Sequence, residues 1–182
     1  MSEPSKYSAV ELLSGGHRIE IRALRSTDRA NLLAAIHQSS SQSIYRRFFS
    51  PKRGFTEKEI AYFLDVDFTN HVALVATQEE DGQQVVVGGA RYIVTRSGSA
   101  ELAFFVVDQY QGLGIGAALM CHLVAIAHAT RIEELHAEVL ADNLAMLGVF
   151  KKSGLPIRTV REGRVVHVVL RVADRGEVVR HG

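Results

Sequence analysis

The sequence of 182 residues contains a single cysteine, no tryptophan and three prolines. The single cysteine, Cys121, allows neither an intramolecular disulfide nor a zinc site built from several cysteines. No apolar run reaches the roughly 18 residues of a membrane-spanning helix. Residues 1–16 are polar and lack the apolar core of a signal peptide. We therefore expect a protein of the reducing cytoplasm with no membrane partner.

An excess of charge of either sign is also missing. The sequence has 21 Lys and Arg residues and 20 Asp and Glu residues, which gives a formal net charge of +1 at pH 7. Nucleic-acid-binding domains carry a strong basic field, so we expect no nucleic-acid partner. The eight histidines show neither H-x-x-x-H nor H-E-x-x-H spacing, which predicts that no metal is bound.

Hydrophobic periodicity predicts one α+β domain over residues 17–174, with flexible tails at 1–16 and 175–182. Three central strands joined by glycine turns are typical of an antiparallel meander. A later strand–helix–strand segment must pair in parallel, so the sheet is mixed. Strands are predicted at 17–24, 72–76, 84–94, 101–107, 135–140, 157–160 and 165–172. Helices are predicted after Thr27 or Asp28, at 57–64, from 115 onward, and after Asp142 or Asn143.

A glycine-rich loop, QGLGIG at residues 111–116, separates an apolar strand from a helix. Glycines let the backbone approach a ligand closely, and the helix that follows presents free N–H groups and its positive dipole end. The loop is therefore a candidate pyrophosphate site. No Lys-Ser or Lys-Thr pair follows the glycines, which argues against a Walker-type nucleoside triphosphatase.

Two other interpretations of the loop remain. Gly112-x-Gly114-x-x-Ala117 also fits a dinucleotide fingerprint, but the candidate ribose-binding acid Asp142 lies 28 residues after Gly114 instead of about 20. Too little chain follows for the further βαβ units of a doubly wound fold. The other alternative is a structural turn that binds nothing.

The loop resembles the Q/R-x-x-G-x-G/A signature of the GNAT superfamily of N-acetyltransferases. The segment from Asn143 through Phe150 to Gly154-Leu155 is similar to the N-x6-Y-x-x-x-G-F stretch of that superfamily. The resemblance covers about residues 19–172 and implies a GNAT fold with acetyl-CoA as co-substrate. Many members have tyrosine where Phe150 stands, as the general acid for the thiolate, so the group that protonates the thiolate stays open.

The resemblance also implies where the cofactor lies. Its pyrophosphate is expected on the amides of the loop, and its pantetheine arm in a splay between the strands at 101–107 and 135–140. Backbone N–H groups after Phe105 are candidates to polarise the thioester carbonyl. The expected cofactor-binding residues are Phe105, Val106, Val107, Gln111, Gly112, Leu113, Gly114, Ile115, Gly116, Ala117, Asn143 and Phe150.

A narrower resemblance rests on three segments in order. They are S-x-x-S-x-Y-x-R-F-F at 40–49, D-x5-A-L-V-A at 67–76 and A-E-x-A-F at 100–104. Together they are similar to the acetyltransferase domain of bacterial Pat-type protein lysine acetyltransferases. This similarity implies a protein lysine as acceptor, with an acyl-CoA synthetase as the best candidate partner. The alternatives are a small-molecule or N-terminal amine as acceptor, or a non-catalytic acyl-CoA-binding module.

Glu101 is the candidate catalytic residue. A lysine amine has a pKa near 10.4 in water, so its attack on a thioester at neutral pH requires a base or a desolvating pocket. Glu101 precedes the apolar run at 102–107. The matching glutamate of Pat-type enzymes is their general base. The alternative is a solvated carboxylate at the end of a strand.

Other reactive side chains receive more modest predictions. Cys121 is expected to be a buried thiol and not a nucleophile, because its neighbour His122 faces another direction on a helix. Tyr45 and Arg47 are candidates to contact a protein substrate or the acyl group, the alternative being simple packing on the sheet. Arg46, Arg47, Lys52 and Arg53 form a local basic cluster.

Overall fold

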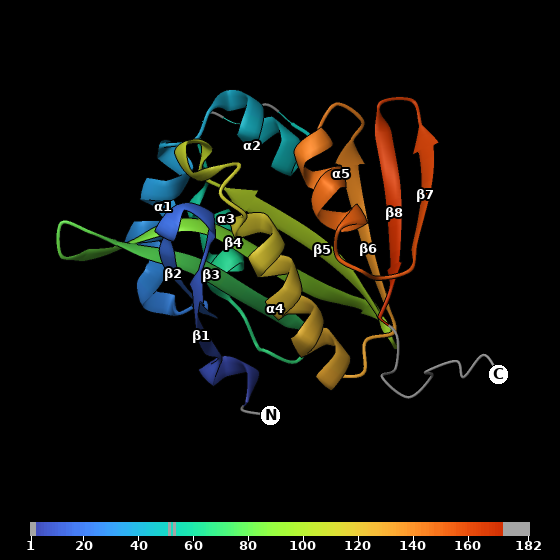
Figure 1. The fold of residues 1–182 in the computed structure, drawn as a ribbon, viewed down its shortest axis with the longest axis horizontal. Coiled ribbons are helices and arrows are strands. Elements are labelled where there is room, and N and C mark those ends of the chain that lie inside the picture. Colours follow the sequence, from blue (N-terminus) through green and yellow to red (C-terminus); the bar gives the residue numbers. More distant parts are fainter. Residues whose placement is uncertain (1–2, 51, 53, 173–182) are drawn as a thin grey trace.

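The computed structural model describes residues 3–50, 52 and 54–172. One mixed sheet has the strand order β1-β2-β3-β4-β5-β6-β8-β7 (Figure 1). Its strands are β1 (Ser8–Leu12), β2 (Arg18–Ala23), β3 (His71–Glu80), β4 (Gln83–Arg96), β5 (Ser99–Val106), β6 (Glu134–Leu140), β7 (Ile157–Glu162) and β8 (Val165–Arg171). The α-helices are α1 (Arg29–His37), α2 (Ser41–Phe48), α3 (Glu57–Leu64), α4 (Ile115–Ala129) and α5 (Leu144–Lys151).

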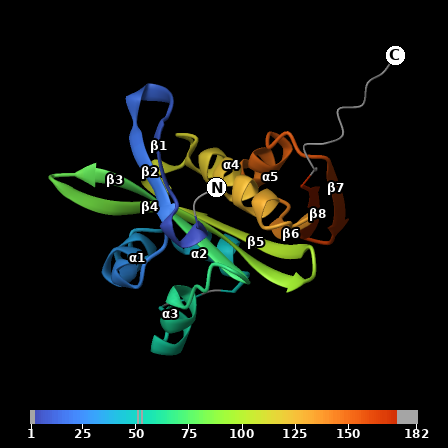
Figure 2. The same cartoon turned by 90° about the horizontal axis from the view of Figure 1, so that it is seen from below.

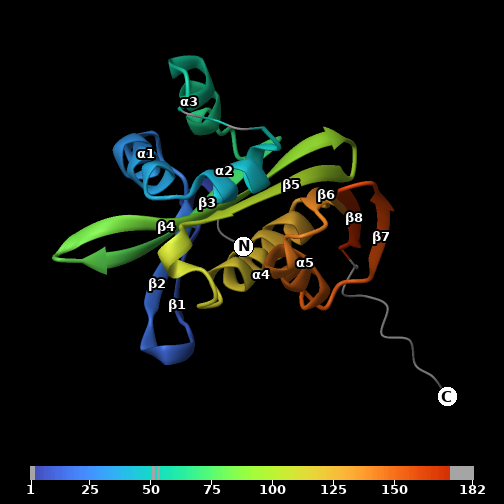
Figure 3. The ribbon, with the colours of Figure 1, turned by 90° about the horizontal axis from the view of Figure 1, so that it is seen from above.

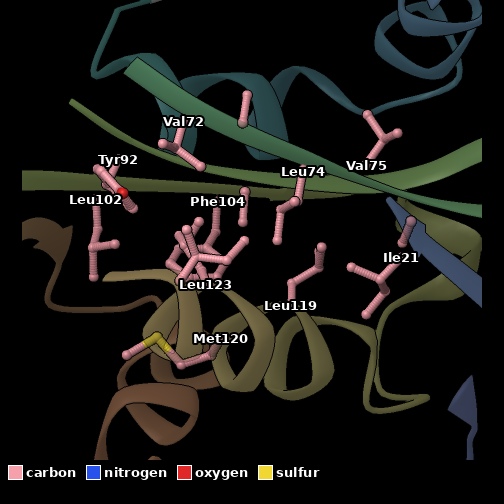
Figure 4. Packing of buried hydrophobic residues seen from close by; sticks show 14 of the residues in the cluster. Ile21, Val72, Leu74, Val75, Tyr92, Leu102, Phe104, Leu119, Met120 and Leu123 are labelled. Atoms are coloured by element: carbon pink, nitrogen blue, oxygen red, sulfur yellow. The ribbon is translucent and has the colours of Figure 1, made fainter. Parts of the chain in front are cut away.

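The helices cover the two faces of the sheet. Figures 2 and 3 show α1, α2 and α3 on one face and α4 with α5 on the other. The main core lies between α4 and strands β3 to β5, where Leu119 and Leu123 of α4 point toward Leu74 and Phe104 (Figure 4). Because side chains alternate along a strand, Leu102 and Phe104 of β5 are buried in this core. The side chains of Glu101, Ala103 and Phe105 therefore face the α1–α3 layer.

The predicted elements occur in the predicted order and the predicted crossover is confirmed, but the structure adds β1 and α2. Strands β3, β4 and β5 form an antiparallel meander, and β5 pairs with β6 in parallel. The α+β class and the mixed sheet follow from this topology. The predicted helix at 57–64 has those bounds, because Thr56 and Glu59 cap each other reciprocally at its start.

Strands β5 and β6 pair over only a short length. The parallel register joins Ser99–Glu101 to Glu134–His136 and then stops. Strand β6 continues to pair with β8 along its whole length, while β5 continues to pair with β4. The two strands therefore diverge beyond Glu101, as Figure 1 shows.

The N-terminal segment differs from the predicted flexible tail at 1–16. Residues Ser8–Leu12 form β1, which pairs antiparallel with β2. The segment also contacts α4, because the Tyr7 hydroxyl hydrogen-bonds His122 Nδ1 and His122 Nε2 lies 2.8 Å from Glu11 Oε1. These are long-range contacts, which a local hydrophobic pattern does not reveal. The tail predicted at 175–182 lies outside the described residues.

Helix α2 is not among the helices that hydrophobic periodicity predicts. The Ser40 hydroxyl caps it by accepting a hydrogen bond from the Ser43 amide at 3.2 Å. Ile44 is the only residue of the helix that is buried. The serine-rich start and the single buried side chain explain why periodicity alone does not indicate this helix.

Candidate active site

A cleft of about 670 Å³ opens where β5 and β6 diverge. Its walls come from β5, the glycine loop with the first turn of α4, β6, α5 and α2. Most of the predicted site residues line this cleft: Glu101, Phe105, Val106, Gln111, Gly112, Gly114, Ile115, Gly116, Ala117, Asn143 and Phe150. Val107 and Leu113 do not line it.

The backbone of β5 presents alternate amides to this cleft. The Val107 N–H donates to the Val87 carbonyl on the β4 side at 3.0 Å. By the alternation of an antiparallel ladder, the amide of Phe105 also points toward β4, and the amides of Phe104 and Val106 point into the divergence from β6. Of the amides predicted after Phe105, that of Val106 faces the divergence, whereas Val107 is buried and bonded to β4. The amide of Phe104, which was not predicted, faces the divergence as well.

The glycine loop has the geometry of an open anion site. Gly112 and Gly114 have φ values of 79° and 94°, and no neighbouring atom lies within 4 Å of where a Cβ would stand on either. Gly114 is also the N-cap of α4. The first amides of α4 therefore face the cleft without a side-chain cap. The Gln111 side chain fixes the loop, donating to the Val106 carbonyl at 3.1 Å and to Ser43 Oγ at 3.3 Å.

Replacing Gly114 by alanine tests whether the loop binds the cofactor. A side chain in this backbone conformation costs about 1–2 kcal/mol of stability. The shift of the loop amides should also weaken acetyl-CoA binding by about tenfold, the value of one charge-assisted hydrogen bond. Gly82, at the tip of the β3–β4 hairpin, has a similar φ of 77° and open surroundings. Gly82→Ala should lose similar stability with unchanged affinity in calorimetry. Equal affinities for the two variants would contradict the assignment.

Helix α5 closes one side of the cleft. The Asn143 side-chain oxygen accepts a hydrogen bond from the Met146 amide at 3.3 Å and so caps the helix. Phe150 is buried and meets Phe104 edge to face, with ring centroids 5.7 Å apart. Phe150 therefore contributes both to the core and to the cleft wall, and its ring has no proton to donate.

Helix α2 brings positive charge to the cleft. The Nε of Arg46 is buried without a hydrogen-bond partner among the described residues, and the nearest atom of Asp142 in their ion pair is 4.0 Å away. Lys152, the C-cap residue of α5, also lines the cleft. These groups, together with the loop amides, suit the phosphates of a CoA molecule.

Glu101 lies at the base of the divergence. It is the last residue of β5 that pairs with β6, opposite His136. Its side chain is exposed to the cleft, and its negative charge acts on the half-buried Arg47 of α2. A solvent-accessible carboxylate at this place can exchange protons with a group in the cleft directly or through water.

Several lining residues were not predicted. Ala137, Glu138 and Val139 of β6 face β5 across the divergence, and Met146 and Val149 come from α5. The β6 residues follow the point where parallel pairing stops, which no sequence pattern marks. Met146 lies one turn from both Asn143 and Phe150, so helical spacing offered a signal for it, whereas Val149 is adjacent to Phe150 and had no such signal.

Cys121 corrects a prediction. The thiol is exposed and not buried, and it does not line the cleft. Cys121 precedes Leu123 by two positions on α4, which places it away from the core-facing side. We expect Cys121→Ala to keep the wild-type kcat, measured as CoA released per enzyme. A large loss would require a thiol nucleophile and would overturn the direct-transfer account below.

Within residues 3–50, 52 and 54–172, no three His, Cys, Asp or Glu side chains come together as a metal site would require. No helix in that part of the chain is both long and apolar enough to span a membrane.

Comparisons with known proteins agree with this geometry. Residues 40–155 match the acetyltransferase (GNAT) family. The acetyltransferase PA5475 of Pseudomonas aeruginosa is 33% identical over 138 residues, which are 75% of this chain and 74% of that protein. The acetyltransferase Pat of Mycolicibacterium smegmatis is 37% identical over 119 residues, 63% of this chain. The match covers only 34% of Pat, so this chain spans about a third of it.

Solved structures show the same fold. The GNAT domain of S. lividans PAT superposes with a TM-score of 0.81 at 30% identity, covering 90% of this chain and 96% of that domain. The yncA structure from Salmonella typhimurium, which contains its cofactor acetyl-CoA, has a TM-score of 0.66 at 18% identity and covers 87% of this chain and 96% of that one. The family match extends from α2 to the end of α5 and so includes the glycine loop and Glu101. The chain belongs to the GNAT family of acetyltransferases.

Proposed function

We propose that this acetyltransferase transfers the acetyl group of acetyl-CoA to a lysine side-chain amine of a protein, with an acyl-CoA synthetase as the best candidate substrate. The observation that carries the proposal is the similarity to the S. lividans PAT domain over almost its whole length, with a TM-score of 0.81. The similarity to Pat of M. smegmatis supports the same class of acceptor.

The residues of the cleft fit a donor of this kind. The amides of the glycine loop and the Arg46 side chain would hold the phosphates, and Asn143 and Phe150 would border the pantetheine arm. Acetyl-CoA supplies an activated acyl group as a thioester. The amides of Phe104 and Val106 would donate hydrogen bonds to its carbonyl oxygen, where negative charge develops during attack.

Glu101 would act as the general base. A lysine side chain enters as an ammonium and must lose one proton before its nitrogen attacks. Glu101 is exposed at the point where the cleft meets the α2 layer, so an incoming amine or a bridging water reaches its carboxylate. Arg47 lies close enough for the two opposite charges to attract each other, which would help to hold the Glu101 side chain beside α2.

A labelling experiment tests the proposed acceptor. The full chain is incubated with radiolabelled acetyl-CoA, a purified acyl-CoA synthetase and a panel of small amines. The same synthetase with its lysines blocked by reductive methylation is the matched control. Label on the untreated synthetase alone supports the proposal. Label on small amines alone would assign a small-amine acetyltransferase, and CoA binding without transfer would assign an acyl-CoA-binding module.

A further inference from the structure

A second, smaller cavity adjoins the cleft on the α1–α3 side of the sheet. It has a volume of about 50 Å³ and shares Arg47, Phe48, Ala103 and Phe105 with the cleft. The small side chains of Ala73 and Ala103 and the absence of one at Gly89 leave this space above the strands. At roughly 10–15 Å³ for each water-sized group, it holds about four such groups.

Two arginines line this cavity. In the sheet register Arg91 of β4 stands between Ala73 of β3 and Ala103 of β5. Arg47 extends from α2 toward the cavity, and its guanidinium carbon lies 4.7 Å from the centre of the Phe48 ring. Burial lowers the pKa of each guanidinium to about 10, and the charge of Arg47 lowers that of Arg91 further. Both therefore stay protonated at neutral pH.

The protein does not balance these charges within the described residues. Arg91 Nη1 donates to the Phe63 carbonyl at 3.3 Å and lies 3.0 Å from His71 Nε2, neither of which is anionic. Burial, followed by the charge of Arg91, lowers the pKa of His71, so that histidine is neutral. Glu101 attracts Arg47, but no carboxylate of the described residues lies within 4.0 Å of either arginine as an ion pair. Two cations thus face one carboxylate.

We propose that the Arg47–Arg91 cavity binds a carboxylate carried on a short aliphatic stem beside the reacting groups. An anion there would meet two guanidinium groups and bring the local charge to balance. Two sources supply this chemistry: the terminal carboxylate of a dicarboxylic acyl group on CoA, or an Asp or Glu side chain next to the acceptor lysine. The second source rests on the proposed function. The transfer chemistry is unchanged in either case. The ammonium loses its first proton through Glu101 to solvent, and the nitrogen then bonds the thioester carbon. The carbon–sulfur bond breaks, and the second proton, lost from the nitrogen, ends on the CoA thiol.

The first arm of the test compares donors. Calorimetry measures the affinity of the full chain for succinyl-CoA and for 4-methylpentanoyl-CoA, which has the same shape without the charge. The second arm compares acceptor-lysine peptides with Glu or Gln beside the lysine, by fluorescence polarisation in the presence of CoA. Both arms read binding, so each gives a result even if no transfer to a protein lysine occurs. Failure of transfer alone would sink the proposed function and leave this inference standing.

We expect the charged ligand to bind at least about tenfold more tightly than its uncharged match in one of the arms. Arg47→Gln should abolish this preference, and Arg47→Lys should keep part of it because lysine retains the charge but not the bidentate fork. Arg96→Gln is the matched control, since Arg96 is exposed on the same strand as Arg91 and lies outside the cavity. A preference in the donor arm identifies the acyl group as the source, and one in the peptide arm identifies the acceptor. No preference in either arm, or a preference that survives Arg47→Gln in a folded variant, would overturn the proposal.

Discussion

We expect Glu101→Gln to lower kcat by about 10²–10⁴-fold, the usual contribution of a general base, and to leave the affinity for acetyl-CoA at the wild-type value. The two effects separate because the proposed base and the proposed cofactor-binding amides lie in different parts of the cleft. The Glu101 carboxylate is exposed in the cleft at the end of the β5–β6 pairing, whereas the loop amides that would hold the cofactor lie at the N-terminus of α4. Glutamine keeps the size and polarity of the side chain but does not accept a proton. Steady-state CoA release and calorimetry measure the two quantities separately.

The controls for this experiment come from other glutamates. Glu79, which is exposed on β3 and lies outside the cleft, should tolerate the same substitution without loss of kcat. Glu138 is the other carboxylate that lines the cleft, and it lies 3.4 Å from His167. If Glu138→Gln lost turnover and Glu101→Gln did not, the base would be wrongly assigned. Near wild-type kcat of Glu101→Gln from about pH 6 to 9 would equally contradict the role.

The largest effect on stability is expected at a buried ion pair. Arg22 of β2 and Asp28, just before α1, are both buried and form two hydrogen bonds of 2.8 and 2.7 Å. Asp28 also accepts the Arg25 amide at 2.7 Å. Asp28→Ala would leave a buried guanidinium without its partner, and the free energy of unfolding should fall by about 3–5 kcal/mol. Urea unfolding followed by circular dichroism measures the change.

A double variant isolates the unpaired charge as the cause. Arg22→Met with Asp28→Ala removes both charges and should be more stable than Asp28→Ala alone. If the two variants were equally unstable, lost packing would be the cause and the charge argument would fail.

The Arg22–Asp28 pair also predicts that the free energy of unfolding depends on pH. Burial acts to raise the pKa of Asp28, but hydrogen bonds from Arg22 and the Arg25 amide outweigh it, and the net pKa is below 3.8. The contribution to stability is therefore present above about pH 4 and is lost as the pH falls through that lowered pKa.

Much of the fold was predictable because local patterns and tertiary contacts agree. The alternation and glycine turns of β3 to β5 mark the meander, and the apolar face of α4 marks the crossover helix. Helix α3 has the predicted bounds because its capping box lies within four consecutive residues, from Thr56 to Glu59. The missed elements, β1 and α2, bury few side chains: β1 has no buried residue and pairs with the adjacent β2, and α2 buries only Ile44. Further contacts come from distant residues, His122 for the segment around β1 and Gln111 for α2.

The candidate site was likewise predictable from the sequence only in part. The glycine loop and Glu101 belong to recognisable segments, and the structure brings them to one cleft. The donors on β5 depend on where its pairing with β6 stops, which only the three-dimensional register reveals. The Arg47–Arg91 cavity depends on α2 lying over β4 and β5. Arg47 was a candidate substrate contact in the sequence, but no sequence pattern pairs it with Arg91. The exposure of Cys121 was available from helical spacing and was misjudged.

The most direct test of the central claim is site-resolved mass spectrometry of one acyl-CoA synthetase. The synthetase is incubated with deuterated acetyl-CoA and either the wild-type chain or Glu101→Gln. The account predicts deuterated acetyl groups on defined lysines with the wild-type chain and close to none with the folded variant. Equal acetylation with both proteins, or none with the wild type while a small amine in the same mixture is acetylated, would contradict it.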